Sequence, residues 1–228
     1  MDGYHLEQAV KSLVQGGYVD RRFASALLKQ LLGICRTESE ELFYALDNPM
    51  QSVIGVLLAR YPKEVWHEAA KLLTSKDWRV RFHAEHLFEP YHQNHRGAGL
   101  LHGLPTSVYL SWVRKAPATR AHVVVKWLPI TETRDGKLAW SAQLGEYVNE
   151  FAHQPRVLDE LTRRLRPTSW SGSIVPHLQP LLPLLETWVA GGQRPELAEW
   201  AHRQLVYIAD EIVSERRRDE ERDAGIYR

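Results

Sequence analysis

The chain has 228 residues, of which 44% are hydrophobic and 25% are charged, a composition that excludes intrinsic disorder and supplies enough apolar surface for a core. Its 29 lysine and arginine residues nearly balance 28 acidic ones, which gives a formal charge of +1. Proteins whose main task is to bind a nucleic-acid backbone are usually far more basic, so the net charge does not support that function. Cys35 is the only cysteine, which excludes an internal disulfide and, within an apolar stretch, predicts a small buried side chain.

Apolar residues recur at three- and four-residue steps along the first 90 residues, a spacing that predicts amphipathic helices. Gly16-Gly17 is expected to end the first helix, because glycine accepts the left-handed cap conformation. Asp47-Asn48-Pro49 is interpreted as the end of one helix and the start of the next. Asn48 can cap a helix, and proline, which has no amide hydrogen, fits the first helical turn, where amide hydrogens have no partner within the helix. Further helix starts are predicted at Asp20, Pro62 and Trp78, and within Thr37–Glu40, which has the pattern of a cap followed by first-turn acids.

The stretch 91–103 is rich in histidine, glycine and asparagine, lacks an apolar period and is predicted to be the longest irregular connection. Thr131–Lys137 and Pro167–Ser173 are predicted to be loops. The run Ala121–Val125 is β-branched, but a lone strand is not stable, so we expect it to be helical. The other helices are predicted at about 105–116, 117–127, 139–152, 155–165, 181–190 and 195–218.

Two segments share one design, a helix, a tight turn and a second helix with an alanine amid bulky residues. They are Pro62–Trp66 leading to Trp78–Ala84, and Leu184–Trp188 leading to Pro195–Ala201. Small residues let two helix axes approach closely. This pattern resembles the helix pairs of HEAT-like α-solenoids, in which each pair buries its apolar face against its neighbours.

The resemblance implies an all-α fold, an irregular array of antiparallel helix pairs with about 10–12 helices. We expect one domain over 1–228, with a candidate division into 1–90 and 104–228 joined by the irregular 91–103 segment.

The last third has a second resemblance. The segment 165–173, Trp188, Trp200 and the charged end 214–221 are similar to C-terminal helical segments of large bacterial NTPase and defence-type signalling proteins. That resemblance implies a module that senses or docks a partner, and the chain shows no nucleotide-binding segment of its own.

Histidines cluster around one predicted helix. His83 and His86 lie three residues apart on one face, and His92 and His95 follow in the irregular segment. Imidazoles at such spacing can ligate zinc, but the usual spacings of zinc sites are not matched. We therefore expect ordinary surface or core-edge histidines, no metal and no other cofactor.

One predicted helix is basic. Arg156, Arg163, Arg164 and Arg166, with Arg114, Arg120 and Lys126 on other helices, are candidates for a basic stripe. HEAT-like DNA glycosylases bind DNA along such a face, whereas a solvated helix face balanced by Asp159 and Glu160 needs no ligand. Trp170 lies in a predicted loop, where it either belongs to a helix-capping turn or anchors a partner contact.

The chain has no phosphate-binding loop, no dinucleotide fingerprint and no nucleophile elbow, so no catalytic residue is expected. We predict a non-enzymatic helical-repeat module that binds another protein or acts as a sensor in a bacterial defence or signalling system, with Trp170, Arg163 and Arg166 as partner-binding residues. A nucleic-acid-binding protein similar to the DNA glycosylases is the alternative. With no signal peptide and no membrane-length apolar run, we expect a cytoplasmic protein without a membrane partner, of open oligomeric state.

Overall fold

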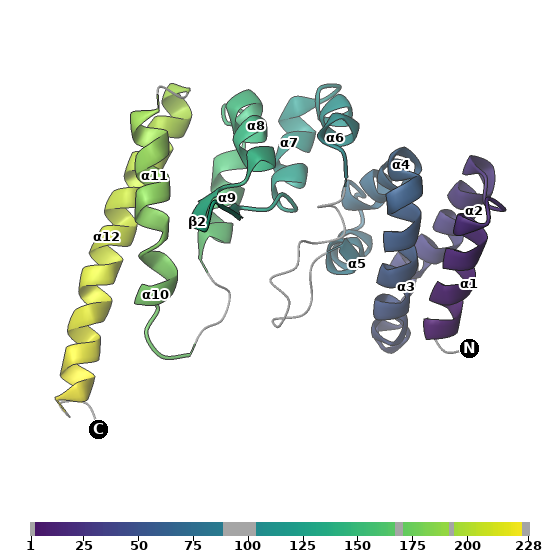
Figure 1. Cartoon of the computed structure of the whole chain (residues 1–228), viewed down its shortest axis with the longest axis horizontal. Helices are drawn as coiled ribbons and strands as arrows, with labels where there is room; N and C mark the ends of the chain where they lie inside the picture. The colour runs from purple at the N-terminus through teal and green to yellow at the C-terminus, as the bar shows by residue number, and fades with distance from the viewer. Residues whose placement is uncertain (1–2, 89–103, 167–170, 192–193, 225–228) are drawn as a thin grey trace. The chain divides into compact units, whose positions relative to one another are not determined.

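The computed structural model describes residues 3–88, 104–166, 171–191 and 194–224 (Figure 1). The chain divides into two compact units, unit 1 (1–116) and unit 2 (117–228). Helices make up most of the described residues of both units, which confirms the expected all-α class. The division falls between Ala116 and Pro117, so the helix that follows the 91–103 segment belongs to unit 1, whereas the sequence places a candidate break at 91–103.

In unit 1, each of the first two α-helices packs mainly on the helix two places further along the chain. Its elements are α1 (Gly3–Gln15), α2 (Arg21–Leu32), the 3₁₀ turn η1 (Gly33–Arg36), α3 (Glu40–Arg60), α4 (Pro62–Leu73), α5 (Trp78–Phe88) and α6 (Thr106–Val113). Helix α1 packs on α3 and α2 packs on α4, while α5 lies against η1, α3 and α4. The HEAT-like geometry of these pairs stays a prediction.

Local sequence signals set the starts of several helices as expected. Asp20 caps α2 by accepting a hydrogen bond from the Phe23 amide at 2.7 Å, and Ser39 caps α3 by accepting from the Leu42 amide at 3.1 Å. Pro62 occupies the first turn of α4, where its missing amide hydrogen costs nothing.

The predicted restart at Asp47-Asn48-Pro49 is wrong, because α3 runs through Pro49 without a break. The Asn48 amide donates to Asp47 Oδ1 at 2.6 Å, and Asn48 caps no new helix. Buried side chains continue along one face on both sides of the proline, among them Phe43 and Val53. Their packing offsets the helix hydrogen bond that the proline removes.

Helix α3 is also the one helix of the described residues that is long and apolar enough to cross a membrane, with 39% of its most apolar window buried inside the protein. A packed core helix meets the same criteria of length and composition, so this property does not identify a membrane span.

Unit 2 contains a hairpin besides its helices. Its elements are α7 (Pro117–Val125), β1 (Thr131–Arg134), β2 (Lys137–Trp140), α8 (Ala142–Phe151), α9 (Val157–Leu165), α10 (Val175–Leu178), α11 (Leu181–Ala190) and α12 (Pro195–Asp223). The β-branched run inside α7 is helical, as predicted. Helix α11 begins at Leu181 after the proline-rich stretch, also as predicted, and α12 continues five residues beyond the predicted end at Arg218.

The predicted loop at Thr131–Lys137 is wrong, since β1 and β2 pair antiparallel with Thr131 opposite Trp140. The turn is Asp135-Gly136, and both residues have positive φ, 51° and 73°. Type I′ two-residue hairpin turns require positive φ at both central residues, and an Asp-Gly pair is among the strongest short-range signals for such a turn. The hairpin therefore takes the residues at 139–140 that the sequence assigned to the next helix.

A tryptophan cluster forms the centre of the unit 2 core. The rings of Trp140 and Trp188 stack 3.9 Å apart at 4°, and Trp200 packs 5.9 Å from Trp188. The indole nitrogen of Trp140 donates to the Leu184 carbonyl at 2.7 Å, and that of Trp200 donates to Thr162 Oγ1 at 2.8 Å. The cluster thus ties β2, α9, α11 and α12 together, and its three indoles are buried, whereas Trp78 in unit 1 is 64% exposed.

Candidate functional site

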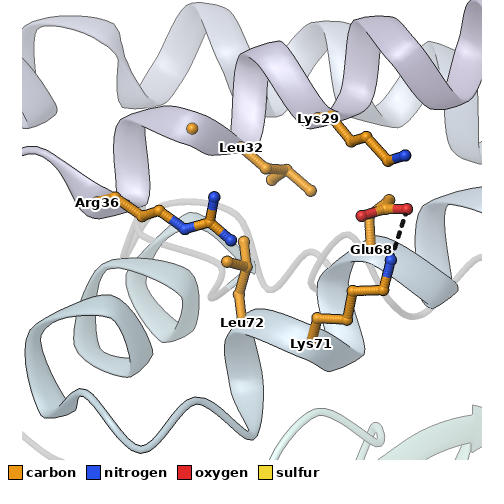
Figure 2. Close-up of a pocket in the computed structure, with 7 residues that line it drawn as sticks. Lys29, Leu32, Arg36, Glu68, Lys71 and Leu72 are labelled. Atoms are coloured by element: carbon orange, nitrogen blue, oxygen red, sulfur yellow. Dashed lines mark hydrogen bonds and ion pairs between the residues drawn. The ribbon is translucent and has the colours of Figure 1, made fainter.

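A pocket of about 270 Å³ lies in unit 1 where α2 and η1 face α4 (Figure 2). Its lining combines two buried leucines with several charged side chains. The residues that line it are Lys29, Leu32, Gly33, Arg36, Glu68, Lys71 and Leu72. We name this site the α2–α4 pocket.

Two lysines flank the one carboxylate of the α2–α4 pocket, and Arg36 adds a third cation to its lining. Glu68 is only 8% exposed, and Lys71 Nζ lies 2.9 Å from its Oε1. Figure 2 shows Lys29, from the facing helix, on the other side of that carboxylate. Because one acid is set against three bases, the pocket keeps an excess of positive charge.

Arg36 extends the positive surface over the apolar floor of the pocket. Its guanidinium reaches toward Leu72 in Figure 2, and neither it nor Lys29 has an ion pair within the described ranges. Leu32 and Leu72 are 3% and 5% exposed, so the floor is part of the core. The pocket therefore offers a guanidinium, two ammonium groups and a small apolar surface to a ligand.

Cys35 lies next to Arg36 but is fully buried. Burial raises the pKa of its thiol to about 12, against the smaller opposing effect of the Arg36 charge. A thiol with that pKa stays protonated at neutral pH and is a poor nucleophile. The chemistry that the pocket supports is thus the binding of an anionic group with an apolar stem.

The structure places the predicted histidines His83 and His86 in the core of unit 1, where they are 1% and 7% exposed. His83 stacks on Phe43 at 4.1 Å, and its Nδ1 lies 3.1 Å from the Cys35 carbonyl oxygen. His86 Nε2 lies 3.1 Å from Asp47 Oδ2. These contacts give both rings structural partners.

Within the described ranges there is no group of three or more histidine, cysteine or acidic side chains that could hold a metal ion. His92 and His95 lie outside the described residues.

Three of the predicted basic residues, all on or directly after α9, contact neighbouring groups. Arg163 is paired with Glu160 at 2.7 Å, and Arg164 donates to the Val125 carbonyl. Arg166 forms an ion pair with Glu211 on α12 and stacks 4.6 Å above the Tyr207 ring. Arg163 and Arg166 therefore each contact a different acid, and their role in binding a partner stays a prediction. Trp170 lies outside the described residues.

Sequence reasoning did not single out the residues of the α2–α4 pocket. Two weak signals were present, since Lys29 and Arg36 are seven residues apart, about two helical turns, and Glu68 and Lys71 stand at pairing distance on one helix. Neither signal reports that the two helices face each other.

Compared with models of known protein families, with curated proteins and with solved structures, the chain shows no match.

Proposed function

We propose that the chain is a non-enzymatic helical module that binds another protein, and that the α2–α4 pocket receives an acidic side chain of that partner. The observation that supports this proposal is the excess of cations, Lys29, Arg36 and Lys71, around a small apolar floor. An aspartate or glutamate side chain has the matching chemistry, a carboxylate on a short apolar stem. Arginine is well suited to such a contact because its planar fork can hold a carboxylate through two hydrogen bonds.

The nucleic-acid alternative has less support from the contacts. Its candidate residues Arg163 and Arg166 are engaged by Glu160 and Glu211, so a phosphate would have to displace these acids. The proposed role in a bacterial defence or signalling system and the cytoplasmic location stay predictions that rest on the sequence.

Binding of a labelled acidic peptide tests the proposal. We expect a fluorescein-labelled Glu-Leu peptide to bind more tightly than its Gln-Leu counterpart, with an affinity that falls as salt is added. Arg36→Glu should weaken binding at least about tenfold, because it removes a cation and adds a repelling charge. Arg22→Glu is the matched control, an exposed arginine at the start of α2 that does not line the pocket, and should change binding less than about twofold.

The proposal fails if the Glu-Leu peptide does not bind at low salt, or if the two charge reversals weaken binding equally. A protein captured from a lysate should likewise be lost by Arg36→Glu and retained by Arg22→Glu.

A further inference from the structure

A second pocket opens along the boundary between the same two helices. It has a volume of about 580 Å³ and is lined by Asp20, Arg21, Arg60, Tyr61, Lys63 and Glu64. We name it the α4-start pocket, because it surrounds the first turn of α4. The Tyr61 hydroxyl donates to the Val19 carbonyl and so holds the start of α4 against the start of α2.

The two pockets lie at opposite ends of one seam because α2 and α4 run in the same direction. At their starts, Arg21 lies 3.5 Å from Glu64. At their ends, Leu32 and Leu72 form the floor of the α2–α4 pocket. A ligand that follows the seam would therefore meet both pockets in turn.

The charges along the seam follow a definite order. Arg60 and Lys63 at the α4-start pocket are exposed and have no ion pair among the residues that the structure describes. Asp20 also lines the α4-start pocket, where its carboxylate caps α2, and Glu64 there is paired with Arg21. Glu68 lies further along α4, beside the cations of the α2–α4 pocket. Each pocket thus has more cations than carboxylates, and along α4 the carboxylates of Glu64 and Glu68 lie between Lys63 and Lys71.

The distance between the two positive ends follows from helix geometry. The α4 residues of the first pocket are centred at position 63 and those of the second near position 70, a separation of about seven residues. At 1.5 Å per residue, that separation is about 11 Å. An extended peptide rises about 3.3 Å per residue, so it covers this distance in about three to four residues, and of these only the even separation, four, puts both side chains on the same face of the segment.

We infer that the seam between α2 and α4 binds an extended segment of the partner protein that carries two acidic residues four positions apart. One acidic side chain enters each pocket, and the carboxylates of Glu64 and Glu68 accept hydrogen bonds from backbone amides between the two acids. The contacts of Glu68 within the described ranges fall on Oε1, so Oε2 is placed to accept such a bond. This inference rests on the proposed function and adds the form and spacing of the bound segment.

An extended segment fits this charge order better than a helix or a nucleic acid. A helical segment uses its amides internally and offers no donors to Glu64 or Glu68. A nucleic-acid strand carries a phosphate about every 3.4 Å of helix axis and would place some of them against these carboxylates.

A peptide series tests the spacing directly. Flexible Gly-Ser peptides carry either one glutamate or two glutamates separated by one to eight positions, and binding is measured by fluorescence anisotropy. We expect the affinity to be highest at a separation of four and at least about tenfold above that of the single-glutamate peptide. N-methylation of the backbone amides between the acids should remove most of that gain.

Two variants separate the inference from the proposed function. Lys63→Glu should abolish the gain from the second glutamate and leave the single-glutamate peptide bound, whereas Arg36→Glu should weaken both. Arg22→Glu serves as the charge-matched control, and circular dichroism verifies that each variant is folded.

The remaining outcomes distinguish the inference about the extended segment from the proposed function. If the single-glutamate peptide binds but the affinity is independent of spacing, the inference is overturned and the proposed function stands. No binding of the single-glutamate peptide overturns both. Tighter binding of an alanine-rich helical peptide with acids seven apart, or of an eight-nucleotide thymidine strand, replaces the extended segment with that ligand.

Discussion

Removal of the central indole of the tryptophan cluster should strongly destabilise unit 2. Trp188 is only 5% exposed and stacks face to face on Trp140 at 3.9 Å. Truncation of a buried tryptophan to alanine costs about 3–5 kcal/mol, and a well-formed aromatic pair contributes about 0.5–1.5 kcal/mol beyond burial. We therefore expect Trp188→Ala to lower the free energy of unfolding by about 4 kcal/mol, a large share of the total stability of a domain.

Urea denaturation followed by far-UV circular dichroism and tryptophan fluorescence measures this loss. Val189→Ala is the matched control, because it shortens the next side chain of the same helix, which is 40% exposed. Its effect should stay within about 0.5 kcal/mol. Trp188→Phe keeps an aromatic ring in the site and should lose about 1–2 kcal/mol, which gives a measurable value even where the alanine variant fails to fold. A loss for Trp188→Ala no larger than that for Val189→Ala would refute the assignment of the cluster to the core.

The remaining predictions concern the cap of α3, the hairpin turn and the buried thiol. Ser39→Ala should lower the free energy of unfolding by about 1 kcal/mol through loss of the cap, while Ser39→Asp should retain most of it in the same denaturation assay. Gly136→Ala should cost about 1–2 kcal/mol from backbone strain alone, since φ is 73° and no atom lies within 4 Å of an added Cβ; equal stability of variant and wild type would contradict this. Because burial raises the pKa of Cys35 from 9.0 to about 12, the thiol loses its proton more readily in the unfolded chain, so stability should fall as pH rises from about 9 to 12. The slope should be on the order of 1.4 kcal/mol per pH unit and absent in Cys35→Ala, and a parallel pH profile of the two proteins would disprove the assignment.

Features that depend on neighbours in sequence were predictable. The caps at Asp20 and Ser39 satisfy amide groups three residues away, and the start of α4 at Pro62 reflects the geometry of proline itself. The burial of Cys35 also follows from the apolar residues beside it. These interactions act within one or two helical turns, so the sequence is sufficient to locate them.

Two local predictions failed, and at both places the structure is held by residues that are distant in the sequence. Pro49 reads as a helix start, but the buried face on both sides of it keeps α3 continuous. Asp135-Gly136 marks a two-residue turn, yet the strands beside it are short, and Trp140 is held in place by stacking on Trp188, 48 residues further along the chain. The residues next to Pro49 and Asp135 in the sequence reveal neither the core on which α3 packs nor the Trp188 ring on which Trp140 stacks.

The sequence by itself determined that this protein is helical and where most of its helices begin and end, because helix formation and capping depend on residues three or four positions apart. Only the tertiary structure decided which charges act together. Lys29 and Lys71 come to the two sides of the Glu68 carboxylate because apolar side chains such as Leu32 and Leu72 pack α2 against α4. The same packing placed His83 and His86 in the core and paired Arg163 and Arg166 with different acids. The burial of apolar surface, which is non-directional and long-range in sequence, therefore brings the candidate binding residues together.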